Sequence, residues 1–147
     1  MIEPLRLSYE IRCAPEHAFD GWTSRLSAWW PAGHSASGDP KTVALMDARL
    51  GGRIFERTAD GREIDWAQIT RWEPPRLFSY SLHIGRDSSQ ATEVALTFVD
   101  LGRGTTRLDI VHTGWERLGA EGQQYRDANT SGWSALIPSF VTAAEAA

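Results

Sequence analysis

Three ionisable residues, His112, Glu56 and Asp65, have the types and surroundings that acid–base chemistry requires. His112 shares its strand parity with Leu108 and Ile110. Its imidazole should therefore face the interior near the end of a strand, where it could exchange a proton with a bound ligand. The alternative is a core histidine that hydrogen-bonds a backbone carbonyl. All three residues are candidates for catalysis, and the catalytic residue itself is unassigned.

Glu56 and Asp65 lie on neighbouring predicted strands. If both faced one cavity, burial and their like charges would raise one pKa and create an acid–base pair. Strand alternation does not determine which face Asp65 occupies, because it shares parity with some apolar neighbours and opposes others. Ion pairs with Arg53, Arg57 or Arg71 on the sheet surface are the favoured alternative for the two carboxylates.

Aromatic residues from four different elements could line a ligand pocket. Seven tryptophans among 147 residues are difficult to pack at native density without leaving space, although an ordinary aromatic core would give the same arrangement. His34 lies in a glycine-containing loop that could close over such a pocket, or it could be exposed to solvent. The candidate ligand-binding residues are Trp30, His34, Trp66, Tyr80, His112 and Trp133.

Sequence motifs for metal or nucleotide chemistry are absent. The four histidines are far apart, and no His-Glu-x-x-His or paired-cysteine motif occurs, so we expect no metal site. The glycine pairs are typical of hairpin turns rather than of phosphate-binding loops, and there is no Gly-x-Ser-x-Gly motif. We therefore expect no cofactor. Cys13 has apolar neighbours and no positive charge on its own face, which favours an inert buried thiol.

The elements that must position these residues follow from the hydrophobic pattern. Residues 5–13 alternate as a half-buried strand, and apolar residues at helical spacing predict two short helices, divided near 23–24 and ended by Pro31. A loop follows over 31–40. Six further strands, separated by turns such as Gly51-Gly52, should form an antiparallel meander. These strands are residues 42–50, 53–58, 62–72, 77–84, 91–99 and 105–113.

The C-terminal segment predicts an amphipathic helix. Ser131 is a suitable N-cap, whereas residues 116–129 are polar with only weak helical character. An apolar stripe follows at helical spacing, formed by Trp133, Leu136, Ile137, Phe140, Val141 and Ala144. These elements predict an α+β fold in which a curved antiparallel sheet of about seven strands wraps around the last helix.

Several segments together resemble one known family. They are GGRIFER at 51–57, DWAQITRWEPPRLFSYSL at 65–82, ATEVALTFVD at 91–100, VHTGWERLG at 111–119 and SGW at 131–133. The chain resembles homologues of the activator of heat-shock protein 90 ATPase, within the START and birch-pollen-allergen superfamily called SRPBCC. The resemblance implies one helix-grip domain over residues 1–147. Members of that superfamily commonly hold an apolar ligand between sheet and helix, and others are cyclases or co-chaperone domains.

Composition limits the partners. The net charge of −4 and the scattered arginines argue against nucleic-acid binding. No apolar run is long enough to span a membrane, and the start of the chain lacks the pattern of a signal peptide, so we expect a cytoplasmic monomer or homodimer. Two functions stay open. One is the binding of a small apolar or aromatic molecule, with or without acid–base catalysis; the other is a protein-interaction module whose partner is a chaperone or another protein.

Overall fold

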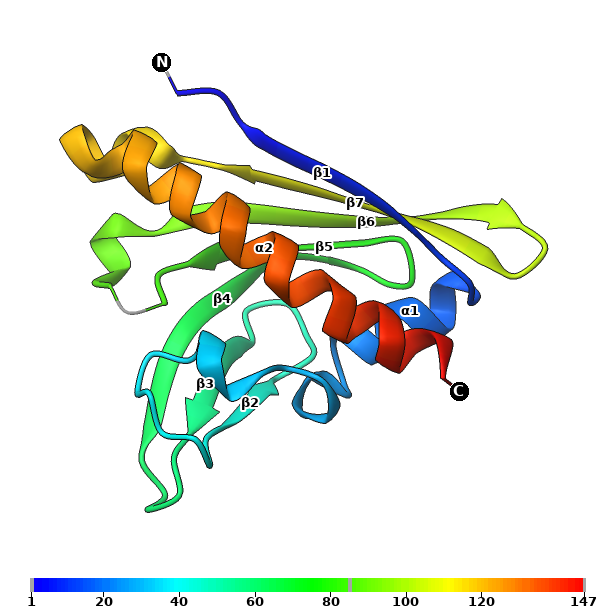
Figure 1. The fold of residues 1–147 in the computed structure, drawn as a ribbon, viewed down its shortest axis with the longest axis horizontal. Helices are drawn as coiled ribbons and strands as arrows, with labels where there is room; N and C mark the ends of the chain where they lie inside the picture. The colour runs from blue at the N-terminus through cyan, green and yellow to red at the C-terminus, as the bar shows by residue number, and fades with distance from the viewer. Residues whose placement is uncertain (1, 85, 147) are drawn as a thin grey trace.

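Seven antiparallel strands form one curled sheet, and a long helix crosses its inner face (Figure 1). The computed structural model describes residues 2–84 and 86–146. The strand order in the sheet is β1-β7-β6-β5-β4-β3-β2. The strands are β1 (Leu5–Ile11), β2 (Val43–Met46), β3 (Arg53–Arg57), β4 (Glu63–Glu73), β5 (Leu77–Leu82), β6 (Thr92–Gly102) and β7 (Thr105–Thr113).

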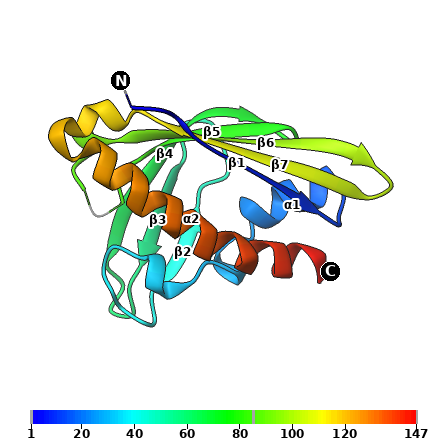
Figure 2. The same ribbon diagram turned by 45° about the horizontal axis from the view of Figure 1, so that its top comes forward.

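This order confirms the predicted meander of six strands. Strand β1 forms the edge of the sheet opposite to β2 and pairs with β7, with Leu5 opposite His112. Glycines with positive φ, Gly51 and Gly61, lie in the turns beside β3, as the turn pattern predicted. Figure 2 shows β4, β3 and β2 turning away from the plane of the other strands, so that the sheet wraps around the helix. The predicted α+β helix-grip fold is confirmed.

Two irregularities in β4 accompany this curl. The pairing of β3 with β4 shifts register between Ile54 and Phe55, and the pairing of β4 with β5 shifts between Ile69 and Arg71. A bulge bends its strand and increases the local twist. The first shift also places two successive side chains, Trp66 and Ala67, in the interior, which strict alternation would forbid.

The helices differ in two places from those expected. Helix α1 (Pro15–Trp22) begins with proline in its first turn, as predicted. The second expected helix is only a 3-10 turn, η1 (Leu26–Ala28), and the loop after it contains another, η2 (Ala32–His34). Further 3-10 segments, η3 (Ser88–Gln90) and η4 (Trp115–Glu121), follow β5 and β7 respectively.

Helix α2 (Gly122–Glu145) is longer than the pattern predicted. Its N-terminal two turns lie within the polar segment that was expected to be only weakly helical, and Ser131 is inside the helix rather than at its cap. Those turns are polar because few of their side chains enter the core, so no apolar period marks them. The predicted stripe faces the core, since Trp133, Leu136, Ile137, Phe140 and Ala144 are buried and Val141 is half-buried. No helix of the described chain is long and apolar enough to cross a membrane.

Candidate functional site

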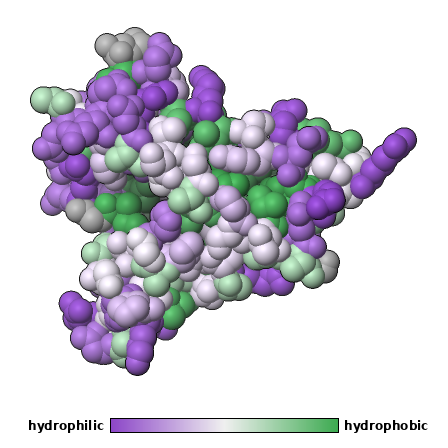
Figure 3. Space-filling view, in the orientation of Figure 1, coloured by the Kyte–Doolittle hydropathy of each residue, from purple (hydrophilic) through white to green (hydrophobic). Residues whose placement is uncertain are grey.

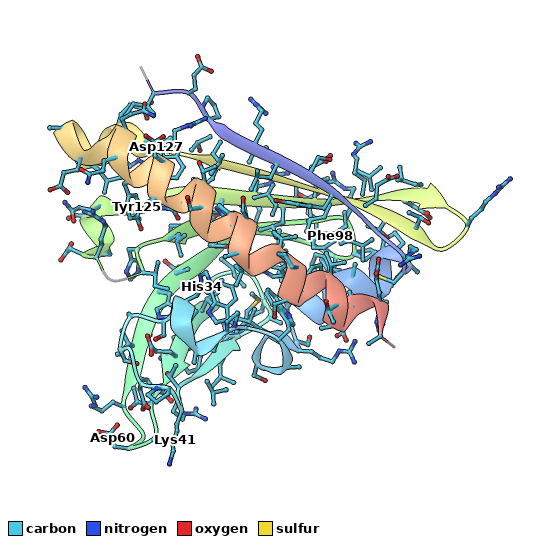
Figure 4. The ribbon with its side chains drawn as sticks, in the orientation of Figure 1. His34, Lys41, Asp60, Phe98, Tyr125 and Asp127 are labelled. Carbon is cyan, nitrogen blue, oxygen red and sulfur yellow. The ribbon has the colours of Figure 1, made fainter. Side chains whose placement is uncertain are left out.

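A pocket of about 600 Å³ lies between α2, β5 and the segment around η2. The space-filling view shows hydrophobic side chains in a notch beside the N-terminal half of α2 (Figure 3). His34 of η2 and Tyr125 of α2 lie along the opening between the helix and the lower part of the sheet (Figure 4). The lining residues are Trp30, Gly33, His34, Ser35, Ala36, Tyr80, Leu82, Ile84, Tyr125, Ala128, Asn129, Gly132, Trp133 and Leu136.

Four of the six candidate ligand-binding residues line this pocket, namely Trp30, His34, Tyr80 and Trp133. The other two, Trp66 and His112, lie behind its walls. Trp66 is 1% exposed and its ring lies 5.3 Å from that of Trp30. His112 is fully buried, and its ring lies 6.0 Å from that of Trp133. Each therefore contacts a residue of the pocket wall rather than the pocket itself.

His112 connects α2 to the sheet through a directed chain of hydrogen bonds. The indole N–H of Trp133 donates to Nδ1 of His112 over 3.0 Å. Because Nδ1 accepts this bond, the proton of the neutral imidazole is on Nε2, which donates to the Thr92 hydroxyl over 2.7 Å. Thr92 in turn lies 3.4 Å from the carbonyl oxygen of Leu82. This series of hydrogen bonds holds the Trp133 ring in a fixed orientation at the pocket wall.

Burial keeps the His112 imidazole neutral. Its ring packs 4.1 Å from that of Trp115, and its two hydrogen-bond partners, Thr92 and Trp133, are uncharged. Desolvation of the charged form lowers the pKa of His112 to about 3. A side chain that is sealed from the pocket and uncharged at neutral pH is suited to positioning Trp133, not to exchanging protons with a ligand.

Glu56 forms the second buried network, on the opposite side of the pocket. Its Oε1 accepts from the backbone N–H groups of Ala36 (2.7 Å) and Ser37 (3.1 Å) and from the indole of Trp66 (2.9 Å). Its Oε2 accepts from the hydroxyls of Ser37 and Thr42. Five donors thus meet one carboxylate, and most of them belong to the loop that leads from η2 into β2. Glu56 attaches this loop to β3 beside the pocket.

Glu56 remains charged although it is fully buried. Burial by itself would raise its pKa, but the hydrogen bonds from Ser37, Thr42, Trp66 and the Ala36 amide outweigh that effect and lower the pKa of Glu56 to about 2. The ion pair that was favoured for this residue does not form, because its oxygens are occupied by these neutral donors.

Asp65 faces the other side of the sheet. Its carboxylate is exposed and accepts from Arg53 Nη1 at 3.0 Å, so the favoured surface ion pair is confirmed for this residue. Asp65 pairs in register with Phe55, whose ring lies on the outer face under the Arg53 guanidinium. Glu56 points inward from the adjacent position. The two carboxylates are therefore on opposite faces and cannot act as one acid–base pair.

One protein-family model covers most of the chain. The model described as Activator of Hsp90 ATPase homolog 1-like protein matches residues 12–145. The chain belongs to this family. The resemblance inferred from the sequence motifs is thereby confirmed. No curated protein sequence matches the chain.

Solved structures place this family member among related folds. The anthrahydroquino-γ-pyrone synthase Txn09, in complex with SUM, is 30% identical, with 84% of each chain covered and a TM-score of 0.62. The self-sacrificing resistance protein CalC from Micromonospora echinospora is 24% identical over 96% of this chain and 93% of its own, with a TM-score of 0.70. PFC0360w, an HSP90 activator from Plasmodium falciparum, is 16% identical over 75% and 71%, with a TM-score of 0.54. The last two show the shared fold alone.

Some pocket residues of this family member were not among the sequence candidates. Leu82 and Ile84 share the parity of Tyr80 on β5, so that signal was present in the alternation. Tyr125 and Asn129 lie in the polar turns of α2 that no apolar period marked. They lie at the pocket because α2 begins at Gly122, nine residues before the start that the sequence predicted.

Two further features of the family member concern chemistry outside the pocket. No group of three or more histidine, cysteine or acidic residues within 2–84 and 86–146 is arranged to hold a metal ion. Cys13 is half-buried, and burial, reinforced by the charge of Glu145, raises the pKa of its thiol. A raised pKa disfavours the reactive thiolate.

Proposed function

We propose that the protein binds a small aromatic molecule in the pocket between α2 and β5. The observation that carries this proposal is the pocket of about 600 Å³ itself, whose walls include Trp30, Tyr80 and Trp133. Ligand sites are concave, mostly apolar and of a few hundred to a thousand cubic ångströms, with a few polar groups for orientation. The pocket matches this description, and flat aromatic walls favour a flat ligand because stacked or edge-on rings attract each other.

The solved relative with 30% identity supports the same class of ligand. Txn09 is an anthrahydroquino-γ-pyrone synthase, and 84% of this chain is covered in the match. Its name describes a product with fused aromatic and oxygen-containing rings. A ligand of two to four fused rings is therefore the first class to test.

Catalysis in the pocket would depend on different residues from those singled out by sequence. Glu56 and His112 are sealed behind the walls, and Asp65 is on the outer face. The ionisable side chains at the pocket are His34, Tyr80 and Tyr125. An acid–base step would therefore fall to His34, because an imidazole has one ring nitrogen that can donate a proton and one that can accept it.

The alternative of a protein-interaction module has less support. Such a module would need a contiguous exposed apolar patch. The large hydrophobic side chains found exposed in the described residues are Val43, Leu50 and Leu101. They lie in β2, in the turn after it and at the β6–β7 hairpin, so they are scattered along the chain and the sheet rather than gathered beside one another.

A variant that fills the pocket tests the proposal. Gly132 lines the pocket within α2, and a Cβ added there meets no atom within 4 Å. Gly132→Leu should therefore fold, because leucine favours helix more than glycine does, while its side chain occupies the ligand space. Ser131→Leu, at the exposed neighbouring position of the same helix, is the matched control.

The measurement is quenching of tryptophan fluorescence by a panel of compounds with two to four fused rings, including fluorene and 9-fluorenone. We expect saturable quenching in the wild type and in Ser131→Leu, and dissociation constants at least about tenfold higher in Gly132→Leu, a loss of about 1.4 kcal/mol. Quenching that is equal in all three proteins, or absent across the panel in the wild type, would contradict the proposal.

A further inference from the structure

We infer that the hydroxyl group of Tyr80 donates a hydrogen bond to an oxygen atom of the ligand, so that the pocket is built for an oxygenated aromatic molecule. The ligand class is then a ketone, quinone or phenol rather than a hydrocarbon. This inference rests on the proposed function and adds to it the chemistry that orients the ligand. Some hydrogen-bond donors at the pocket already have a partner among the described residues, and the Tyr80 hydroxyl does not.

The Tyr80 hydroxyl has no hydrogen-bond partner within residues 2–84 and 86–146, although the residue is only 4% exposed. Every fully enclosed side-chain nitrogen or oxygen in that part of the chain does have a partner. The hydroxyl is therefore not sealed inside protein, and the space it adjoins is the pocket that Tyr80 lines. The hydroxyl is therefore free to donate to a group that enters the pocket, and a ligand oxygen would give it a partner there.

The indole N–H groups of the pocket wall are used differently. Trp133 donates to Nδ1 of His112 over 3.0 Å, and Trp30 donates to the carbonyl oxygen of His34 over 3.3 Å. Both groups are thereby committed to the protein and present only ring surface to the ligand. Two tyrosine hydroxyls, those of Tyr80 and Tyr125, remain as aromatic donors at the pocket, and Tyr80 is the deeply buried one.

The Tyr80 ring is held rigidly, which suits it for orienting a ligand. It lies on β5, an inner strand, paired with Ile69 of β4 and Val94 of β6. Its ring stacks on that of Phe78 with the centroids 5.9 Å apart and an interplanar angle of 27°. A donor that is already fixed loses little conformational entropy when the ligand binds.

The environment also fixes the protonation state of this donor. Burial raises the pKa of Tyr80 well above its ordinary value of 10.0. The phenol is therefore neutral at physiological pH and retains its proton for donation. A ligand oxygen that only accepts, such as a ketone or quinone carbonyl, fits this donor directly.

Paired probes and a single-atom variant test the inference. Fluorene and 9-fluorenone share one ring skeleton and differ by a carbonyl oxygen, and Tyr80→Phe removes only the hydroxyl. We expect Tyr80→Phe to weaken binding of 9-fluorenone about tenfold, which corresponds to one hydrogen bond of about 1.4 kcal/mol. Binding of fluorene should change less than about twofold. Both affinities are measured by tryptophan fluorescence titration.

Tyr9→Phe is the control, because it removes the hydroxyl of a half-buried tyrosine on β1 that does not line the pocket. It should leave the ratio of the two affinities unchanged. The unfolding midpoint of Tyr80→Phe should equal that of the wild type, since no bond within the described protein is lost. Equal effects of Tyr80→Phe on both probes would overturn the inference while leaving the proposed function intact. Failure of both probes to bind the wild type would contradict the proposed function, and this inference with it.

Discussion

Two buried ionisable groups lie on either side of the pocket, and they differ in charge. Glu56 accepts five hydrogen bonds and is ionised, with its pKa lowered to about 2. His112 accepts one bond, donates another and is neutral, with its pKa lowered to about 3. Both residues are fully buried, so burial alone does not explain the difference.

The number and type of neighbouring groups decide the charge. Desolvation opposes the charged form of both side chains. At Glu56 five donors compensate for it, whereas at His112 a charged imidazolium would lose the bond from the Trp133 indole, which can only donate. The carboxylate network attaches the loop at residues 36–42, and the imidazole network attaches the Trp133 ring to the sheet. Each network supports one wall of the pocket without entering it.

The largest effect is expected where the charged network loses its acceptor. Glu56→Leu leaves the buried indole N–H of Trp66 and the part-buried N–H groups of Ala36 and Ser37 without a partner, and a fully buried group in that state costs about 1 to 3 kcal/mol. We expect a loss of roughly 4 kcal/mol or more in the free energy of unfolding, a large part of the 5 to 15 kcal/mol typical of a domain. Urea denaturation measures it.

Glu56→Gln separates charge from geometry in the same network. Its amide oxygen can replace Oε1, and the hydroxyls of Ser37 and Thr42 can rotate to accept from its NH₂ group. This variant should lose only about 1 to 2 kcal/mol, the extra strength of bonds to a charged acceptor. If glutamine were as harmful as leucine, the charge rather than the set of bonds would hold the loop.

The neutral network should tolerate loss of its central residue somewhat better. His112→Leu leaves the Trp133 indole N–H unpaired and changes the packing against Trp115, so we expect a loss of about 3 kcal/mol in the free energy of unfolding. His112→Gln retains an acceptor and a donor and should recover part of this loss. Weaker ligand binding by His112→Leu with unchanged stability would instead mean that the imidazole contacts the ligand.

Acid should distinguish the two networks by the pH at which each fails. Below its ordinary pKa of 6.5 the unfolded His112 binds a proton, whereas the folded residue does not until about pH 3. The unfolded state therefore takes up more protons, and the free energy of unfolding falls as the pH decreases through this window. From pH 7 to pH 5 the fall due to His112 should be about 2 kcal/mol. Glu56 contributes only below about pH 4.5, its ordinary pKa, since its stabilisation is lost between there and about pH 2.

The measurement is urea denaturation at pH 7, 6 and 5 for the wild type and for His112→Gln. The variant should lose the fall of about 2 kcal/mol in this range, because glutamine does not titrate. An unchanged pH dependence in His112→Gln would show that other groups titrate in this window and that the imidazole is not kept neutral by burial.

The sequence predicted the meander and the apolar stripe of α2 because both depend on local periodicity. It did not predict which face Asp65 and Trp66 occupy, because the register shift between Ile54 and Phe55 changes the parity of β4 at that point. The donors to Glu56 lie up to 20 positions away in the chain, and Trp133 lies 21 positions from His112. Hydrogen bonds between residues so far apart produce no recognisable spacing in the sequence. The sequence therefore could not distinguish residues that support the pocket wall from residues that line the pocket.

The smallest losses of stability are expected for substitutions of the threonine in each network, Thr42 beside Glu56 and Thr92 beside His112. Thr42→Val removes one of five donors to Glu56, and Oε2 keeps the bond from the Ser37 hydroxyl, so we expect a loss of only about 0.5 to 1 kcal/mol in the free energy of unfolding. Thr92→Val is the matched change in the other network. It leaves the Nε2–H of His112 without an acceptor in a dry interior, since that nitrogen cannot give up its proton while Nδ1 accepts from Trp133.

We therefore expect Thr92→Val to cost about 1.5 kcal/mol, clearly more than Thr42→Val. Urea denaturation of both variants, which are close in size to the wild-type side chains, measures the difference. Equal losses would mean that the two networks tolerate the loss of one hydrogen bond equally well. The number of donors would then not determine how strongly each network stabilises its pocket wall. A larger loss for Thr92→Val would mean that the carboxylate tolerates the loss of one donor, because no other group is left unpaired. The imidazole would then be the more sensitive group, because its bond from Trp133 determines which ring nitrogen carries the proton and so requires Thr92 as the acceptor.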